Sequence, residues 1–317
     1  MLLKKLHLLK MNTFRLVFDK DFFYSGDYVT GHFVIQNSSP MNIKAIILAF
    51  KGQAKISIPK SALRNASSSK PKPICILLDK TCPTPQIRLF RCATGCIIEP
   101  GEHAYRISYK LPKLIPSSYE GTFGKIQYKA TAFVGVGESV AESEITVIKA
   151  LDALYYESLA SPQRACKIKA FNRLSMVSNS RSVFVQLSLP GVISPAGKIY
   201  AELNVSNPSG IHLSNITLYL IRTEKFIIPN CAEQLVKIIL ENVDLGSVDA
   251  GAGKSFKQTL VVPNNCDRNL AHCSIIDVNH SVKAVIRPSG LYSKLSLKLP
   301  VVVGTLYRNV EPLVSKY

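Results

Sequence analysis

The sequence lacks any long uninterrupted hydrophobic run. Its 317 residues are 47% hydrophobic, but apolar stretches such as 43–50 are broken by a lysine. None reaches the roughly 18 residues that a membrane-spanning helix needs. Glycine and proline, at 17 and 18 residues, are near ordinary usage, which excludes collagen-like and low-complexity chains. The sequence therefore predicts a soluble protein with packed hydrophobic cores.

Acidic residues are scarce, and one long segment has none. The 39 Lys and Arg against 21 Asp and Glu give a net charge of +18, which favours anionic partners. No Asp or Glu occurs from Tyr28 to Leu78, and the later part of this segment, rich in Ser and Pro, is typical of an exposed loop. We predict that it binds phosphorylated peptides or anionic phospholipid. The predicted binding residues are Lys55, Lys60, Arg64, Lys70 and Lys72. The alternative is that these cations only solvate strand faces and protect sheet edges.

Metal-binding and catalytic motifs are also missing. The sequence has eight cysteines but no Cys-x-x-Cys, and Cys92-x3-Cys96 has no second close pair, which argues against structural zinc. His272, Cys273 and His280 likewise lack a second pair at ligand spacing. There is no Gly-x-Ser-x-Gly or His-Glu-x-x-His motif. We therefore expect no enzymatic activity, no metal and no other cofactor.

The cysteines and the chain start bear on the cellular compartment. The first ten residues are interrupted by lysines and lack the apolar core of a signal peptide. We therefore expect a cytoplasmic protein with reduced cysteines, most of them buried as small hydrophobic side chains. Five Asn-x-Ser/Thr sequons keep a secreted, glycosylated β-sandwich binding protein open as an alternative. They lie at Asn37, Asn65, Asn204, Asn215 and Asn279.

Period-two alternation of hydrophobic and polar residues dominates the chain. It occurs in 29–35, 126–132, 199–205 and 216–220, and the runs are separated by clusters of Gly, Pro, Asn and Ser. This pattern predicts an all-β protein built from antiparallel β-sandwiches. The segment 232–240 fits a helical period as well as a strand period.

An internal repeat predicts two tandem domains. Shifting the sequence by 170 residues places the first-strand residues Val29, Phe33, Ile35 and Asn37 on Ile199, Leu203, Val205 and Asn207. Gly26 and Gly197 precede these strands and allow a tight turn, and Gly31 leaves room for close approach by a neighbouring strand. The predicted domains are an N-terminal β-sandwich, 11–155, and a C-terminal β-sandwich, 181–308. A hinge and first-strand region, 156–180, joins them, and a short tail, 309–317, follows.

Several motifs resemble those of the arrestin domain-containing (α-arrestin) family. The segments 25–31 and 43–52 resemble the opening strands of an arrestin N-terminal domain, and 111–128 resembles the "LP…PSSFEGxxGxIRY" signature of the family. In the second half, 193–200, 272–276 and 299–305 resemble the arrestin C-terminal domain. The resemblance spans roughly 12 to 308 and implies two immunoglobulin-like sandwiches joined by a short hinge. We expect structural roles, in turns and strands, for eight residues of these motifs. They are Gly26, Gly31, Pro116, Glu120, Gly121, Gly124, Pro300 and Gly304.

The resemblance implies a function as well as a fold. Members of the family are adaptors that bind membrane-protein cargo, such as receptors or transporters, and link it to ubiquitin ligases or the endocytic machinery. The expected location is the cytoplasm, peripherally at the plasma membrane or endosomes. The sequence contains no Pro-Pro-x-Tyr motif, through which α-arrestins recruit ligases, so ligase recruitment stays open. A second interpretation is a structural subunit of a retromer-type trafficking coat. No nucleic-acid partner is expected. No match is found to the buried charged cluster of phosphate-triggered arrestins.

Overall fold

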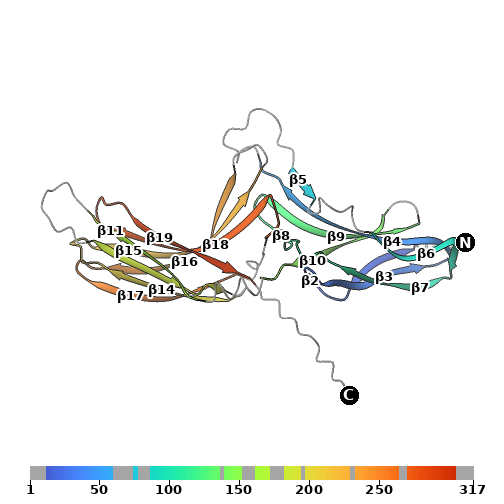
Figure 1. Ribbon diagram of the computed structural model, residues 1–317, viewed down its shortest axis with the longest axis horizontal. Helices are drawn as coiled ribbons and strands as arrows, with labels where there is room; N and C mark the ends of the chain where they lie inside the picture. The colour runs from blue at the N-terminus through green and yellow to red at the C-terminus, as the bar shows by residue number, and fades with distance from the viewer. Residues whose placement is uncertain are drawn as a thin grey trace, which may run out of the picture. The chain divides into compact units, whose positions relative to one another are not determined.

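The protein is all-β. The computed structural model describes residues 12–59, 74–77, 86–135, 139–151, 161–171, 182–193, 197–228, 233–263 and 270–304. Within these ranges every regular element is a β-strand (Figure 1), which confirms the predicted fold class. Contacts divide the chain into two units. Unit 1 is Met1–Lys149 with Ala271–Ile275, and unit 2 is Ala150–Leu270 with Ile276–Tyr317.

Unit 1 contains two sheets. Its strands are β1 (Thr13–Phe18), β2 (Phe22–Tyr24), β3 (Tyr28–Asn37), β4 (Met41–Ile56), β5 (Ile74–Leu77), β6 (Gln86–Ile98), β7 (Gly101–Lys110), β8 (Tyr119–Glu120), β9 (Gly124–Val134) and β10 (Ser139–Ile148). The smaller sheet has the order β1-β3-β7. The larger has the order β2-β10-β9-β4-β5, with β6 also paired to β4 and β8 to β9. The rings of Phe50 on β4 and Tyr109 on β7 stack at 4.1 Å between centroids, so the two sheets pack face to face.

Unit 2 repeats this plan. Its strands are β11 (Gln163–Lys169), β12 (Val183–Leu189), β13 (Val192–Ile193), β14 (Lys198–Ser206), β15 (Leu213–Phe226), β16 (Gln234–Val248), β17 (Gly253–Val261), β18 (Ile276–Pro288) and β19 (Leu295–Val303). The sheets have the orders β11-β12-β14-β17 and β13-β19-β18-β15-β16. The ambiguous segment 232–240 is a strand from Gln234 onward, because β16 pairs with β15 along its length.

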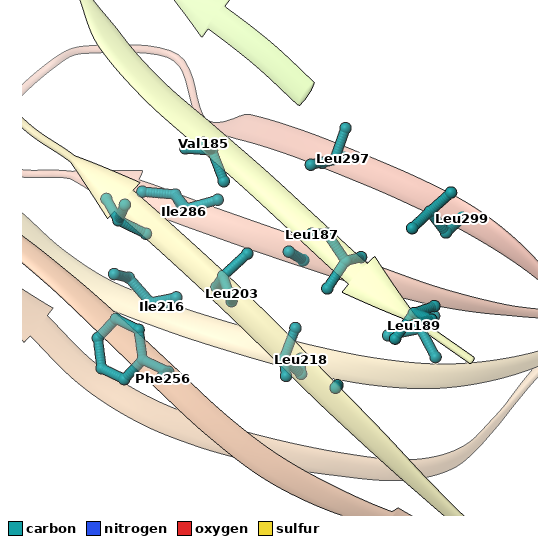
Figure 2. Packing of buried hydrophobic residues seen from close by; sticks show 14 of the residues in the cluster. Val185, Leu187, Leu189, Leu203, Ile216, Leu218, Phe256, Ile286, Leu297 and Leu299 are labelled. Atoms are coloured by element: carbon teal, nitrogen blue, oxygen red, sulfur yellow. The ribbon is translucent and has the colours of Figure 1, made fainter. Parts of the chain in front are cut away.

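The core of unit 2 lies between its two sheets. Alternate residues of β12 point inward, with Val185, Leu187 and Leu189 almost fully buried. Figure 2 shows them facing Leu297 and Leu299 of β19, with Ile216 and Leu218 of β15 in the same layer. Burying one such side chain stabilises the fold by about 1.5–3 kcal/mol, so the alternating pattern supplies the driving force for the sandwich.

The predicted repeat corresponds to a repeated piece of structure. Asn37 ends β3 and Asn207 follows β14, and both are buried. The side-chain amide of Asn37 donates hydrogen bonds to the carbonyls of Ser39 and Glu99, at 2.9 and 3.0 Å. That of Asn207 donates to the carbonyls of Ile211 and Asp249, both at 2.9 Å. Each asparagine thus ties the turn after its own strand to the β6–β7 or β16–β17 turn, so the two copies share one hydrogen-bonding device.

Two glycines meet strict backbone requirements. A Cβ atom on Gly31 would lie 2.2 Å from the carbonyl oxygen of Val17 on the neighbouring β1. This steric clash means that the position requires glycine. Gly26 adopts a φ of +92° in the β2–β3 turn, in the left-handed region that favours glycine.

The remaining motif residues lie in turns and strands. The carbonyl of Pro116 accepts a hydrogen bond from the Tyr128 hydroxyl at 2.7 Å. The amide of Gly121 donates to the carbonyl of Gly124 at 2.9 Å and closes a tight turn. Glu120 is exposed on β8. Pro300 lies on β19 opposite Ser281, and Gly304 follows that strand, packed against Leu151.

The expected burial of the cysteines is wrong where the structure describes their side chains. Cys96 and Cys166 are exposed, and Cys92 and Cys273 are only half-buried. Cys96 precedes the β6–β7 turn and Cys166 lies on β11, at the edge of its sheet. Position in the sheet, rather than side-chain hydrophobicity, therefore decides their exposure.

Candidate anion-binding face

One of the five predicted binding residues is described. Lys60, Arg64, Lys70 and Lys72 lie outside the described residues. Lys55 lies half-buried near the end of β4, where it is paired in register with Cys75 of β5 and Lys125 of β9. The structure therefore places Lys55 on the surface of a sheet rather than in a loop.

Strand alternation gathers lysines on the outer face of the larger sheet of unit 1. Leu48, Phe50 and Ala54 of β4 are buried, so the residues between them, including Lys51, point outward. Lys51 is paired in register with Lys129, as Lys55 is with Lys125. Like charges directly opposite each other across two strands are destabilising. Glu142 of β10 partners Lys129, so the repulsion that a bound anion would relieve is that between Lys55 and Lys125.

Strand β6 extends this charged surface. Arg88 and Arg91 are exposed and lie opposite Ile47 and Ala45 of β4, and Lys44 is exposed beside Ala45. We call six residues the cationic face. They are Lys44, Lys51, Lys55, Arg88, Arg91 and Lys125. Among the described residues, no ion pair neutralises any of the six.

The neighbouring strand β10 carries two acids of this sheet, Glu142 and Glu144. Lys129 Nζ lies 2.7 Å from Glu142 Oε2. This hydrogen bond and the charge attraction raise the pKa of Lys129, and the same hydrogen bond lowers the pKa of Glu142. Gln127 donates to Glu144 at 3.2 Å. The acids of β10 are therefore engaged with β9. The described acid that borders the cationic face is Glu120, opposite Lys125.

The sequence reasoning missed most of this face. Lys44 and Lys51 belong to the acid-free segment but were not selected, because the prediction favoured its loop-like part. Arg88 and Lys125 lie far away in the sequence and reach the face only through strand pairing. The alternation of 126–132 is the signal that places Lys125 and Lys129 on the side opposite the core.

A buried charged group in unit 2 was also missed. Arg222 Nη2 lies 3.1 Å from Glu224 Oε1, and the Glu224 side chain is fully buried. His280 of β18, opposite Arg222 in register, is buried as well. Burial, and secondly the charge of Arg222, lower the pKa of His280 to about 4. The available signal was the occurrence of Arg and Glu at inward positions that continue the series of Leu218 and Leu220.

No group of three possible metal ligands is found in the described part of the chain. Nor does that part contain a helix long and apolar enough to cross a membrane. What the larger sheet of unit 1 offers is a broad cationic surface on a two-sandwich scaffold.

The fold and the sequence define the class of protein. The chain matches the family model "Arrestin (or S-antigen), N-terminal domain" over residues 13–154 and "Arrestin (or S-antigen), C-terminal domain" over 180–307. The chain therefore belongs to the arrestin family, whose members are generally non-enzymatic adaptors.

Its relatives are arrestin domain-containing proteins. It is 24% identical over 315 residues to arrestin domain-containing protein 4 of Homo sapiens, covering 95% of this chain and 73% of that protein. It is 23% identical over 321 residues to arrestin domain-containing protein 17 of Caenorhabditis elegans, with 94% and 72% covered. Over 218 residues it is 22% identical to human arrestin domain-containing protein 1, with 67% and 48% covered. The suspected family resemblance is thus confirmed at the level of distant homology.

Proposed function

We propose that this protein is a non-enzymatic adaptor that binds anionic segments of membrane-protein cargo and acts in membrane-protein trafficking. It would work in the cytoplasm, at the surface of the plasma membrane or endosomes. Membership of the arrestin family supports the adaptor role. The observation that carries the choice of ligand is the cationic face, where Lys55 and Lys125 oppose each other and none of the six residues has an ion pair among the described residues.

A phosphorylated cargo segment fits the charge of this face. A phosphoserine carries about −1.5 to −2 charges near neutral pH and three strong acceptor oxygens. Charge-assisted hydrogen bonds from Lys51, Lys55 and Arg88 to such groups are stronger than neutral ones. Each exposed pair contributes about 0.2–1 kcal/mol, so several must act together. The binding would be moderate in affinity and would weaken as salt rises.

Strand β6 offers a second source of affinity. In the described part of unit 1, β6 pairs with β4 on one side and lies at the edge of the larger sheet. An extended cargo segment added there would gain main-chain hydrogen bonds, as in β-augmentation. Its alternate side chains would lie next to Arg88 and Arg91, so edge pairing and charge recognition would act on the same segment.

Charge reversal tests this proposal. The probe is a synthetic serine-rich peptide with three phosphoserines, and its binding is followed by fluorescence anisotropy against the unphosphorylated peptide. We expect the triple variant Lys51→Glu, Lys55→Glu, Arg88→Glu to lose phosphopeptide binding. The matched control, Lys237→Glu, Lys257→Glu, Lys294→Glu, makes the same charge change at exposed positions of unit 2 and should keep it. Equal loss in both variants, or none in the first, would refute the cationic face as the site.

A further inference from the structure

The segment after β7 in unit 1 holds a hydrophobic side chain out in solvent. Leu111 and Ile115 are buried, with 4% and 8% of their surface exposed. Between them, Pro112, Lys113 and Leu114 are exposed, and Leu114 is 68% exposed. The two buried residues anchor a short outward bulge with a leucine on it.

Hydrogen bonds fix this bulge from both sides. The Leu111 amide donates to the carbonyl of Asp27 at 2.8 Å, and Lys149 Nζ donates to the carbonyl of Lys113 at 3.1 Å. Further along, the Ser118 amide donates to the carbonyl of Val147 at 2.8 Å. Because its backbone is tied to the β2–β3 turn and to the end of β10, the bulge presents Leu114 without a large ordering cost on binding.

Three lysines and an aromatic ring lie on the bulge and on the strand ends that adjoin it. Lys110 ends β7, Lys113 is part of the bulge, and Lys149 reaches it from the end of β10. Lys110 Nζ lies 5.6 Å from the centre of the Tyr28 ring, and Tyr28 is 54% exposed. Apart from Asp27, the segments 24–28, 110–116 and 147–149 contain no acidic residue. The combination is an exposed apolar side chain on a segment whose neighbours are mostly basic.

We infer that this basic–apolar loop, residues 110–115, contacts an anionic lipid bilayer. Leu114 enters the boundary between head groups and acyl chains, while Lys110 and Lys113 lie at the phosphate groups. Tyr28, with an apolar ring and a polar hydroxyl, suits the same interface. A projecting leucine matches a soft, continuous apolar layer better than it matches a peptide, which would need a groove to receive it. This contact uses residues separate from the cationic face.

The size of each effect can be expressed as a change in the partition coefficient. A lysine close to an anionic membrane strengthens binding about fivefold, so reversing two lysines should weaken it by at least about 25-fold. Shortening Leu114 to alanine removes several buried carbon atoms and should weaken binding by about tenfold. Neither change touches a buried residue, so the fold should persist.

The absence of tryptophan from the chain makes insertion directly measurable. The variant Leu114→Trp carries a single tryptophan at the tip of the loop. We expect its emission to shift to the blue with vesicles of phosphatidylserine and phosphatidylcholine, and to stay unchanged with phosphatidylcholine alone. The control Leu235→Trp, at a leucine that is 58% exposed on β16, should show no shift.

Co-sedimentation with the same vesicles completes the test. The wild-type protein should bind, Lys110→Glu with Lys113→Glu should lose binding, Leu114→Ala should weaken it, and Leu235→Ala should not. The inference is overturned if the wild-type protein ignores the anionic vesicles or if Leu114→Ala binds as well as the wild type. It is also overturned if the phosphoserine peptide, without vesicles, produces the blue shift in Leu114→Trp. The triple variant of the cationic face should keep the vesicle-induced shift, which separates this inference from cargo binding.

Discussion

The buried histidine of unit 2 makes the stability of that unit depend on pH. His280 lies opposite Arg222, next to the fully buried Glu224. Burial, and secondly the positive charge of Arg222, lower the pKa of His280 from 6.5 to about 4. Between these values the unfolded chain binds a proton that the folded chain does not. The free energy of unfolding therefore falls as pH decreases from about 6.5 to about 4, and this group causes no further loss below that.

The magnitude follows from the two pKa values. Each unit of difference corresponds to about 1.4 kcal/mol, so the full effect is about 3 kcal/mol. From about pH 7 to about pH 5 the expected loss is about 2 kcal/mol. Such a loss is a substantial part of the stability of an ordinary domain, which is about 5–15 kcal/mol.

Urea unfolding at the two pH values measures this effect, with pulsed hydrogen exchange and mass spectrometry reading peptides of β15 and β18. The variant His280→Gln is the control, because it is polar but does not titrate and leaves Arg222 and Glu224 in place. We expect the stability difference between the wild type and the variant to change by about 2 kcal/mol over this range. Parallel pH profiles for the two proteins would refute the reasoning.

Three further changes test the packing of the scaffold. Replacing Glu224 by Gln leaves the mostly buried Arg222 without its charged partner and should lower the free energy of unfolding by about 3–5 kcal/mol in urea titrations. A loss below about 1 kcal/mol would show that the pair is solvated. Asn207→Ala removes three side-chain hydrogen bonds, two donated to the carbonyls of Ile211 and Asp249 and one accepted from the Ser209 hydroxyl, and should cost about 2 kcal/mol. The cost is read from the hydrogen exchange of β14 and β15 peptides, and unchanged exchange would contradict the stabilising role of this repeated turn. Gly31→Ala should lower the thermal unfolding midpoint, because the added Cβ would meet the β1 backbone. The control Gly210→Ala should leave the midpoint at the wild-type value, because no atom lies within 4 Å of its added Cβ. A wild-type midpoint for Gly31→Ala would contradict the close approach of β1.

Hydrophobic alternation predicted the strands over 29–35, 126–132, 199–205 and 216–220, and the repeat that relates the first to the third. The series Val29, Phe33 and Ile35 lies inside unit 1 as expected, because a strand with one buried face permits little freedom in register. The sequence showed that Asn37 and Asn207 occupy equivalent positions in the repeat. It did not show that each donates hydrogen bonds to a turn distant in the sequence.

The candidate site was harder to predict because it is assembled across strands. Lys55 was selected from a local run of cations, whereas Arg88 and Lys125 join it only through the pairing of β4 with β6 and β9. The sequence around Lys55 does not indicate which strands pair with β4. The Arg222–Glu224 pair escaped for a related reason. A charged residue is predicted to be exposed unless the inward positions of its strand are known.

Proximity labelling in cells tests the adaptor role most directly. A labelling enzyme fused to the wild-type protein should mark receptors or transporters at the cytoplasmic membrane surface. The same fusion carrying Lys51→Glu, Lys55→Glu and Arg88→Glu should lose those proteins while keeping its other neighbours. Identical membrane-protein neighbours for both fusions, or a fixed set of soluble coat subunits in place of membrane proteins, would contradict the account.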